Sequence, residues 1–329
     1  MGRRGTVGET RMPRHRHPSL GVALRVFEKL TRGQRAPPGE EAVGRVVFLG
    51  EGIHYRAYGA TCLIDGRDVA LVARIPHRDA GRAVSEAATR ERRLLEHLGR
   101  LGLPIRIPRP VAEVPVSTGL AIVQEWVRGV PCETRVPVSG GRPWEHVAEA
   151  AAAVHAVDPA PLRVFLPAEK DVRGHALGQL AGLRDLPIPE AADALAWAEA
   201  NLPTEEPPVL LHGDLLGQNL LLAPDEPLGV IDWGMACIGD PAYDLAVVTR
   251  GARRPFQAER GLERLLEAYE RRSGRTLPPS RVHLHELVLC AGFYEQEVEV
   301  HGAGSAAAEQ ARAKLRSVLE RAIAGRGGR

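Results

Sequence analysis

Residues 210–219 read Leu-Leu-His-Gly-Asp-Leu-Leu-Gly-Gln-Asn, and residues 230–234 read Val-Ile-Asp-Trp-Gly. Together the two stretches place a carboxylate at Asp214, a carboxamide at Asn219 and a second carboxylate at Asp232, each just beyond a short apolar run. Phosphoryl transfer needs this set of groups. One Asp orients or deprotonates the attacking hydroxyl, while an Asn and a second Asp hold the magnesium ions that bridge the nucleotide phosphates.

The spacing follows the kinase patterns H-R-D-L-x-x-x-N and D-F-G with two exchanges. Gly213 stands in place of the Arg, and Trp233 stands in place of the Phe. We predict that Asp214 is the catalytic base, because it stands at the position of the Asp in the kinase pattern. A positioned carboxylate typically contributes ~10² to 10⁴ in rate. His212 follows an apolar run, which favours a packed histidine that holds the loop backbone over an acid–base group.

Asn219 and Asp232 are the predicted magnesium ligands, because Mg²⁺ prefers oxygen donors and usually takes only one or two from the protein. Taken singly, each residue has a structural alternative. Asp214 could cap a turn, Asn219 could bond the loop backbone, and Asp232 could accept hydrogen bonds at a strand end. Their joint spacing favours the catalytic interpretation.

The composition is typical of a soluble, globular protein. The 329 residues are 44% hydrophobic and 26% charged, and they suffice for one large domain or two lobes. The net charge of +2 is too small to suggest nucleic acid as the main partner. No apolar run approaches the ~18 residues of a membrane span, so we expect no membrane partner either.

The cysteines favour a reducing compartment, and we therefore expect a cytoplasmic protein. They are widely scattered and form no C-x-x-C pair, so a zinc site is not expected and free buried thiols are the favoured interpretation. The four positions are Cys62, Cys132, Cys237 and Cys290. Residues 1–18 are rich in Arg and His and are most simply a solvated basic tail.

Along the chain, a β-rich part precedes a helical part. Short β-rich runs cover residues 45–49, 55–64, 69–75, 111–114 and 121–126, which make a five-stranded sheet plausible. Asp65-Gly66 reads as a hairpin turn between two of these runs. Helical patterns cover residues 19–32, 83–99, 143–157, 189–201 and most of 240–325. Residues 209–233 read as strand, loop, strand, turn and strand, so the catalytic loop lies on a small β-element inside the helical part.

The catalytic stretch resembles the aminoglycoside phosphotransferase family, the small-molecule kinases related to choline and homoserine kinases. Residues 239–246 read Gly-Asp-Pro-Ala-Tyr-Asp-Leu-Ala and match the family element G-D-P-x-x-D-L-A, and the stretch before the loop, residues 196–203, is also similar. The resemblance covers about residues 44–300. By this resemblance Asp244 is the buried helix aspartate that supports the catalytic loop.

The resemblance implies an α+β, bilobal, protein-kinase-like fold with ATP, or alternatively GTP, in the cleft. Residues 1–40 would then form a basic tail and a short helix, partly disordered. Residues 41–127 would form the small N-lobe, a nucleotide-binding β-sheet with one helix. Residues 128–329 would form the larger, mainly helical C-lobe, with the catalytic loop and the acceptor site.

The resemblance also implies nucleotide-binding residues. Gly52 lies in the expected phosphate-covering hairpin, where a residue without Cβ can expose backbone N–H groups. Arg74 stands where the family carries its phosphate-gripping cation, often Lys, and Glu91 on the following helix would pair with it; a solvated helix face is the alternative for Glu91. Gln124 and Trp126 lie where the inter-lobe hinge bonds the adenine through backbone groups.

A small molecule is the expected acceptor. Only four residues separate Gly234 from Gly239, which leaves no room for the activation segment and A-P-E motif of protein kinases. Residues 156–207 hold nine acidic and four basic residues, and this net charge of −5 favours a cationic acceptor such as an aminoglycoside, although a solvated surface explains it equally well.

The leading hypothesis is ATP-dependent O-phosphorylation of an aminoglycoside-type antibiotic, and hence antibiotic resistance. The alternatives are a kinase of a macrolide or of a small metabolite (an amino alcohol, a homoserine-like compound or a sugar) and a nucleotide-binding pseudokinase. A module tethered to DNA or a membrane through the basic tail would require that deletion of residues 1–35 abolish function. The sequence leaves the oligomeric state open.

Overall fold

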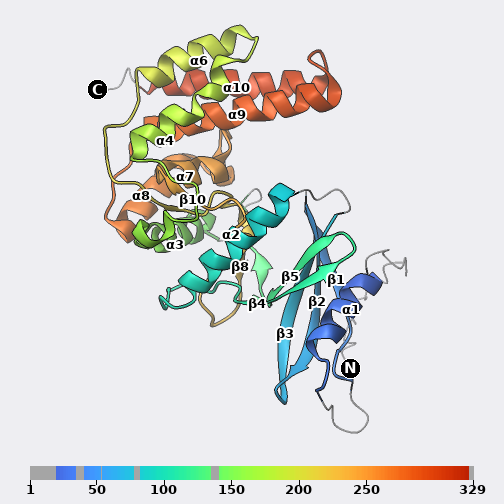
Figure 1. Ribbon diagram of the computed structural model, residues 1–329. Coiled ribbons are helices and arrows are strands. Elements are labelled where there is room, and N and C mark those ends of the chain that lie inside the picture. The colour runs from blue at the N-terminus through green and yellow to red at the C-terminus, as the bar shows by residue number, and fades with distance from the viewer. Residues whose placement is uncertain (1–19, 35–40, 53, 78–81, 135–140, 326–329) are drawn as a thin grey trace, which may run out of the picture. The chain divides into compact units, whose positions relative to one another are not determined.

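The computed structural model describes residues 20–34, 41–52, 54–77, 82–134 and 141–325 (Figure 1). The expected basic tail, residues 1–18, lies outside the described residues. The chain divides into two compact units. The first comprises Met1–Ser85 and Pro110–Trp126, and the second comprises Glu86–Arg109 and Val127–Arg329.

The first unit is built on an antiparallel sheet of five strands in the order β1-β2-β3-β5-β4 (Figure 1). The strands are β1 (Val47–Glu51), β2 (Tyr55–Ile64), β3 (Arg67–Pro76), β4 (Pro110–Val116) and β5 (Gly119–Glu125). The predicted turn Asp65-Gly66 joins β2 to β3. Its two residues have φ of 49° and 76°, as a two-residue hairpin that matches the strand twist requires.

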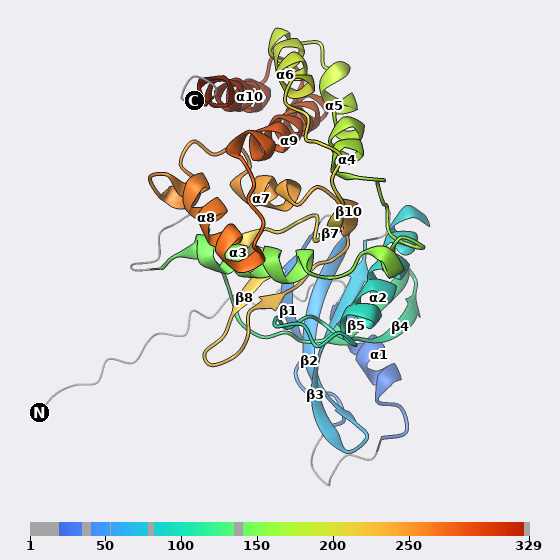
Figure 2. The same ribbon diagram turned by 90° about the vertical axis from the view of Figure 1, so that its left-hand side faces the viewer.

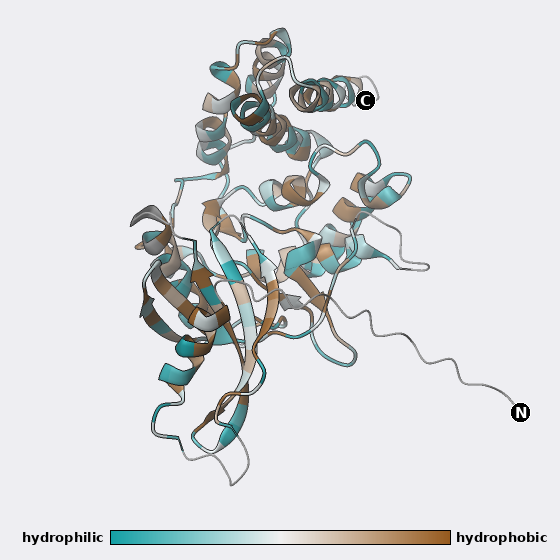
Figure 3. Ribbon diagram, turned by 90° about the vertical axis from the view of Figure 1, so that its right-hand side faces the viewer, coloured by the Kyte–Doolittle hydropathy of each residue, from teal (hydrophilic) through white to brown (hydrophobic). Residues whose placement is uncertain are grey.

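One helix, α1 (Leu20–Leu30), packs against β2 and β3 of this sheet. Its buried residues are Ala23, Val26 and Phe27, at the spacing of three and four that puts side chains on one face of a helix. They join inward-facing strand residues such as Tyr58 and Leu71 in a single hydrophobic core. Hydrophobic segments along the strands of the sheet are visible in Figure 3.

The second unit is mostly helical, which confirms the predicted α+β class. The helices are α2 (Arg82–Leu98, all but its first four residues), α3 (Pro143–His155), α4 (Val172–Gln179), α5 (Ala181–Arg184), α6 (Pro189–Glu199), α7 (Ala242–Thr249), α8 (Gly261–Ser273), α9 (Pro279–His301) and α10 (Ala306–Ala324). The helices α9 and α10 lie side by side (Figures 1 and 2). No helix in the described part of the chain is long and apolar enough to cross a membrane.

Two helices of this unit, α4 and α5, were not predicted. The first carries two glycines and the second has only four residues, so neither shows a helical period in the sequence. A local cap holds α4 in place, because the side chain of Asp171 accepts a hydrogen bond from the backbone N–H of Gly174 at 2.8 Å.

Short strands frame the catalytic loop. The strand β7 (Val209–Leu211) pairs antiparallel with β10 (Cys237–Gly239), and β8 (Leu220–Leu222) lies between β6 (Val130–Pro131) and β9 (Gly229–Val230). The loop leaves β7, passes through the 3₁₀ turn Gly217–Asn219 and enters β8. The predicted strand–loop–strand–turn–strand order is present, but β7 takes β10 as its partner and not β8.

The described residues of the second unit form two hydrophobic cores. One surrounds α3 and the strands at the catalytic loop, and the other lies among α5, α6, α9 and α10. The apolar runs beside the loop supply Leu210, Leu215, Leu220 and Trp233 to the first core. These four side chains are at most 1% exposed, so they hold both ends of the loop at fixed points.

Candidate active site

The catalytic loop approaches the Asp232–Gly234 turn so closely that it needs a glycine. Gly213 has φ of +82°, and a Cβ atom at this position would lie 2.1 Å from the carbonyl oxygen of Met235. An L side chain therefore meets both a left-handed backbone and a backbone oxygen. This contact explains why the position that carries Arg in protein kinases carries Gly in this chain.

Asp244, in the first turn of α7, holds the backbone of the loop. Its Oδ2 accepts from the N–H of His212 at 2.9 Å, and its Oδ1 accepts from the N–H of Gly213 at 2.8 Å. Burial alone would raise the pKa of this fully buried carboxyl, but the hydrogen bond and charge of His155 and the contacts with His212 bring the pKa below its usual value. Asp244 is thus ionised, and both of its oxygens are bound by the loop.

His155 and Tyr269 continue this support inward. The Nε2 of His155 lies 3.1 Å from Oδ2 of Asp244, and its Nδ1 lies 2.8 Å from the hydroxyl of Tyr269. Both rings are buried. The chain of three side chains links the loop to α3 and α8.

His212 connects the two halves of the motif. Its Nε2–H donates to the carbonyl oxygen of Ile231 at 3.0 Å, so its Nδ1 is the acceptor for the N–H of Asp214 at 3.3 Å. The ring is fully buried and lies 4.7 Å from the ring of Trp233. The histidine therefore positions the loop against the segment that carries Asp232, which is the arrangement expected of a packed histidine.

Asn219 and Asp214 are in direct contact. The side-chain Nδ2 of Asn219 donates to the backbone oxygen of Asp214 at 2.8 Å and to its Oδ2 at 3.0 Å. Burial and the neighbouring charge of Asp232 raise the pKa of Asp214, against the opposing effects of Asn219 and Arg250. The amide nitrogen of Asn219 is thus engaged by the loop itself, whereas its Oδ1 makes neither of these contacts.

Asp232 is exposed and has a left-handed backbone with φ of +66°, which is rare for a residue other than Gly. The next residue fixes this conformation, because the buried ring of Trp233 donates from Nε1 to the carbonyl oxygen of Val230 at 3.1 Å. Left-handed residues that surrounding structure holds in place concentrate at functional sites.

Glu91 lies beside this turn. A Cβ atom on Gly234 would lie 3.7 Å from Oε2 of Glu91 and 4.0 Å from Oδ1 of Asp232, so the two carboxylates flank the glycine. Glu91 is 4% exposed. The alternative that Glu91 sits on a solvated helix face is therefore wrong, because its face of α2 is turned into the second unit.

The donors at the loop fit a magnesium ion. Among the described residues, no group of three or more His, Cys, Asp or Glu side chains could hold a metal by itself. Mg²⁺ does not need such a group, because it usually binds through one or two protein oxygens together with phosphates and water. The Oδ1 of Asn219 and the carboxylate of Asp232 supply oxygens of this kind.

Arg74 and Gly52 belong to the first unit. Arg74 lies in strand β3, and its guanidinium carbon is 4.8 Å from the ring centroid of Tyr55 in β2. The N–H of Gly52 donates to the carbonyl oxygen of Tyr55 at 2.8 Å, and its own carbonyl lies 3.0 Å from Nε2 of His77. The amide of Gly52 thus closes the hairpin, and Ile53 at the tip lies outside the described residues.

Gln124 and Trp126 lie at the end of β5 and just beyond it. Gln124 is buried, and its Oε1 has no hydrogen-bond partner among the described residues. The N–H of Trp126 donates to the carbonyl oxygen of Ala70 at 2.9 Å, so this amide belongs to the sheet and is not offered to a ligand. The ring of Trp126 covers Gly59, where a Cβ atom would lie 2.6 Å from the indole.

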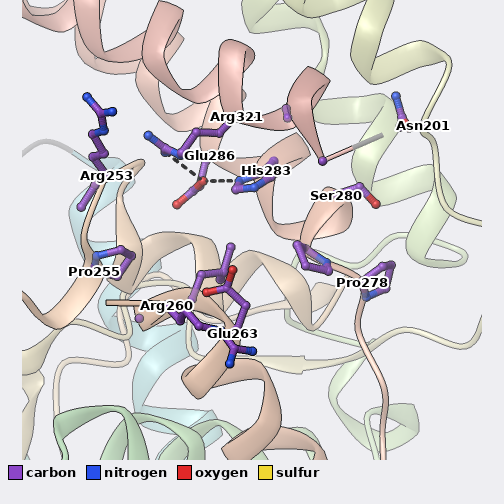
Figure 4. A pocket seen from close by; sticks show the side chains of 16 residues that line it. Asn201, Arg253, Pro255, Arg260, Glu263, Pro278, Ser280, His283, Glu286 and Arg321 are labelled. Atoms are coloured by element: carbon purple, nitrogen blue, oxygen red, sulfur yellow. Dashed lines mark hydrogen bonds and ion pairs between the residues drawn. The ribbon is translucent and has the colours of Figure 1, made fainter. Parts of the chain in front are cut away.

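A separate cavity of about 590 Å³ lies in the second unit, between α8, α9 and the end of α10 (Figure 4). Its walls carry Arg253, Arg260, Arg321 and the pair of His283 and Glu286. None of the predicted site residues lines it.

Sequence reasoning also missed Arg250, whose charge acts on Asp214, because no motif marks this position.

The comparisons with known proteins agree with this geometry. A family model, described as the phosphotransferase enzyme family, matches residues 58–282. Homoserine kinase of Brucella anthropi is 29% identical over 168 residues, 47% of this chain and 49% of that protein. The chain spans less than half of the length of the curated relatives it matches.

Two solved structures share the fold. Macrolide 2'-phosphotransferase MphH from Brachybacterium faecium has a TM-score of 0.61 at 24% identity, over 90% of this chain and 97% of that one. A thermostable mutant of aminoglycoside phosphotransferase APH(4)-Ia, in a ternary complex with ADP and hygromycin B, has a TM-score of 0.64 at 17% identity, over 91% of this chain and 98% of that one. These likenesses confirm the predicted kinase-like fold.

Proposed function

The chain belongs to the phosphotransferase enzyme family, and we propose that it transfers the γ-phosphoryl group of ATP to a hydroxyl of a small molecule. The observation that carries this proposal is the contact between Asn219 and Asp214 at the end of a loop that Asp244 and His212 hold rigid. A phosphotransferase depends mainly on such positioning, because its transition state requires little covalent chemistry from the protein.

In this proposal Asp214 accepts the proton of the acceptor hydroxyl. The hydroxyl oxygen forms a bond to the γ-phosphorus while the bond from that phosphorus to the bridging oxygen of ADP breaks, and the proton passes to the Asp214 carboxylate. The raised pKa of Asp214 supports this role, because it makes the carboxylate a better proton acceptor than an exposed aspartate.

Asn219 and Asp232 would hold the magnesium ion, through Oδ1 and the carboxylate. When bound, the ion neutralises charge on the nucleotide phosphates. The amide nitrogen of Asn219 is engaged by Asp214, so its Oδ1 is the atom that would meet the ion.

The roles of the predicted nucleotide-binding residues are proposals. Arg74 would grip the phosphates, and Glu91 would also support nucleotide binding. The amide of Gly52 is engaged by Tyr55. Gly52 would therefore act through the shape of its hairpin, where a residue without Cβ lets the backbone approach the phosphates. Gln124 would meet the base with its unpartnered Oε1, and Trp126 would contribute its carbonyl or ring. GTP is the alternative nucleotide.

For the acceptor we propose an aminoglycoside-type antibiotic, because residues 156–207 carry a net charge of −5. Similar proteins include a macrolide phosphotransferase and a homoserine kinase by name. A macrolide and a small metabolite (an amino alcohol, a homoserine-like compound or a sugar) are therefore the alternatives.

A pseudokinase that binds nucleotide without turnover is the second candidate. The observation in its favour is Arg74 in place of the usual lysine, because a guanidinium is not equivalent to an ammonium at a phosphate. Magnesium-dependent ATP binding without turnover on any acceptor would support it.

The test is an ATP-consumption screen of the purified protein against antibiotics and small alcohols. Products are checked by mass for one added phosphoryl group, and each hit is repeated with Asp214→Asn. We expect at least one acceptor whose phosphorylation depends on Asp214. Phosphorylated product from Asp214→Asn at the wild-type rate would overturn the proposed mechanism.

A further inference from the structure

Two histidines and a glutamine form a polar cluster in the second unit. His175 and Gln179 lie one turn apart on α4, and His285 lies on α9, which packs against α4. Both imidazole rings are buried, and Gln179 is half-buried. The side-chain Nε2 of Gln179 lies 3.1 Å from Nε2 of His175, and its Oε1 lies 3.0 Å from Nδ1 of His285. One amide group therefore links the two rings.

The cluster contacts the residue at which α7 is anchored. The backbone N–H of Asp240, two residues before α7 begins, donates to Nδ1 of His175 at 3.2 Å. Nε2 of His285 lies 3.1 Å from Oδ2 of Asp240. The same carboxylate accepts from the N–H of Ala242 at 2.9 Å, in the first turn of α7. The two histidines thus hold both the backbone and the side chain of Asp240.

Two short paths lead from this cluster to the catalytic loop. The ring of His175 lies against Gly239 in β10, where a Cβ atom would be 2.6 Å from the imidazole. The strand β10 pairs with β7, and the chain passes from β7 directly into His212. On the other path, α7 carries Asp244, whose carboxylate holds the N–H groups of His212 and Gly213. A displacement of His175 therefore acts on the strand before the loop and on the helix that supports it.

The protons of the cluster cannot satisfy every contact at once. Nδ1 of His175 faces the N–H of Asp240, and Nε2 of the same ring faces the amide nitrogen of Gln179. A neutral imidazole has one acceptor nitrogen and one N–H, so it accepts only one of these two hydrogen bonds. Either the amide of Gln179 turns over and presents its oxygen to His175, or the N–H of Asp240 loses its acceptor. The cluster thus has two alternative arrangements.

The two arrangements differ by one proton. With the amide oxygen turned to His175, that ring carries its proton on Nε2, the amide nitrogen donates to Nδ1 of His285, and both rings are neutral. With the amide nitrogen turned to His175, the amide oxygen requires a proton on Nδ1 of His285. Nε2 of His285 also keeps its proton, because it faces the carboxylate of Asp240, so this ring is an imidazolium. The proton of His175 is then on Nδ1, where it opposes the N–H of Asp240.

The neutral arrangement is favoured except at acid pH. Burial lowers the pKa of His175 to about 4, and the charge of His285 adds to this effect, whereas Asp240 and Asp244 oppose it. Because this pKa is below that of a histidine in the unfolded chain, the folded pair takes up its extra proton only as the pH falls well below neutral. The ionisable groups on the segments next to His175 are Glu169 before α4, Cys237 in β10, Asp240, Tyr243 and Asp244 at α7, and Arg281 and His285 in α9.

We propose that Gln179 is a positioning residue for the catalytic loop and that its amide works as a proton-controlled latch. In the neutral pair the amide keeps His175 on the N–H of Asp240. When His285 takes up one proton from solvent, the amide turns over and this contact is released. The effect on turnover rests on the proposed function, which the latch would regulate, whereas the latch itself is a property of the fold.

Three variants test the latch. Gln179→Leu removes both hydrogen bonds of the amide. Gln179→Glu offers only acceptor oxygens, so it keeps the proton of His175 on Nε2 and places a proton on Nδ1 of His285 without rotation of the side chain. Gln296→Leu is the matched control, because it makes the same exchange as the first variant at an exposed position of α9.

Two measurements need no acceptor. Two-bond proton–nitrogen correlation spectra of isotopically labelled protein report which ring nitrogens of His175 and His285 carry protons. Hydrogen exchange of residues 209–219, divided by the intrinsic exchange rate at each pH, reports how firmly the catalytic loop is held. Both are recorded between about pH 7 and pH 4, where histidines titrate. The kcat and the KM of ATP are then measured on an acceptor that the screen identifies.

We expect wild-type His175 to carry its proton on Nε2 near neutral pH, with His285 neutral, and the loop to lose protection as the pair takes up its extra proton. Gln179→Leu should raise loop exchange by about tenfold or more, the effect of leaving a buried polar group without its partner. It should lower kcat and leave the KM of ATP unchanged. Gln179→Glu should restore loop protection and most of kcat, with an imidazolium at His285. Gln296→Leu should behave as the wild type.

The latch is ruled out if His175 carries its proton on Nδ1 near neutral pH, or if Gln179→Glu loses as much loop protection as Gln179→Leu. It is also ruled out if loop exchange is unchanged when the pair takes up its proton, a result that the wild type gives even where Gln179→Leu folds poorly. A change in loop exchange without a change in kcat overturns the positioning role. Failure of the proposed function is a different result, because no acceptor is then phosphorylated while the proton positions and the loop exchange still decide the latch.

Discussion

The amide nitrogen of Asn219 donates to the carboxylate of Asp214 at 3.0 Å and also to its backbone oxygen at 2.8 Å. One side chain thus holds the proposed base at two points. The amide oxygen, turned away from these contacts, is left to the proposed metal site. The contact couples proton acceptance and metal binding in the proposed site through two residues that are five positions apart in the chain.

Asp214→Asn should lower kcat by ~10² or more, because it removes the proton acceptor while keeping the shape of the side chain. Folding and nucleotide binding should be preserved, since the loop is held mainly by Asp244 and His212. Rapid-quench or coupled assays measure kcat, and thermal melting provides the control. Near wild-type turnover would show that another group accepts the proton.

Asp232→Ala should weaken the binding of ATP in the presence of Mg²⁺ and leave binding without the ion little changed, because it removes an oxygen ligand. Calorimetry at several Mg²⁺ concentrations measures both. Asp225→Ala is the matched control, since Asp225 is also an exposed aspartate with a left-handed backbone, at φ of 57°. Equal affinities for the two variants would rule out the metal role of Asp232.

Gly213→Ala should destabilise the protein and also abolish most turnover. Gly66→Ala should lower the free energy of unfolding by only about 1–2 kcal/mol, the cost of a left-handed backbone at alanine. Both glycines have similar φ, 82° and 76°, but a Cβ atom would meet the Met235 oxygen at 2.1 Å in the first and nothing within 4 Å in the second. Chemical denaturation and kcat measure the two effects. If the variants lose equal stability and keep equal activity, the contact with Met235 is unimportant.

Asp240 should contribute to the pH dependence of stability. Burial opposes ionisation of this carboxyl, but His285 and Arg281 bring its pKa from 3.8 to about 2. Because the pKa is lower in the folded state, the stabilisation is complete above the unfolded pKa and is lost as the pH falls through the folded pKa. This pKa shift corresponds to roughly 2 kcal/mol in the free energy of unfolding.

Denaturation curves of the wild type and Asp240→Asn, recorded from pH 6 down to about pH 2, check this expectation. The difference in stability between the two proteins should shrink between pH 4 and pH 2. A difference that stays constant over this range would show that the charge of Asp240 does not stabilise the fold.

Several parts of the fold could be predicted because their signals are local. The turn Asp65-Gly66 follows from two residues that tolerate positive φ, and the face of α1 follows from the spacing of Ala23, Val26 and Phe27. The pairing of β7 with β10 could not be predicted in this way. Strands of three residues are too short to show a period, and their partners are chosen by the packing of the whole unit.

The candidate site also has features that the sequence predicts and features that depend on packing. The spacing of Asp214, Asn219 and Asp232 is visible in the sequence, and their roles remain predictions. The burial of Glu91 beside Gly234 was open, because an amphipathic helix pattern does not state which face meets another element. The engagement of the Gly52 amide by Tyr55 was hidden as well, since it depends on how the hairpin closes.

The sequence by itself determined the family, the kinase-like fold and the set of groups for phosphoryl transfer, because these depend on residue types at short spacings beside apolar runs. Only the tertiary structure decided why position 213 must be Gly, and that His175, Gln179 and His285 meet. These contacts join residues far apart in the chain. Their energies arise from packing and charge in three dimensions, and no local pattern of residues records them.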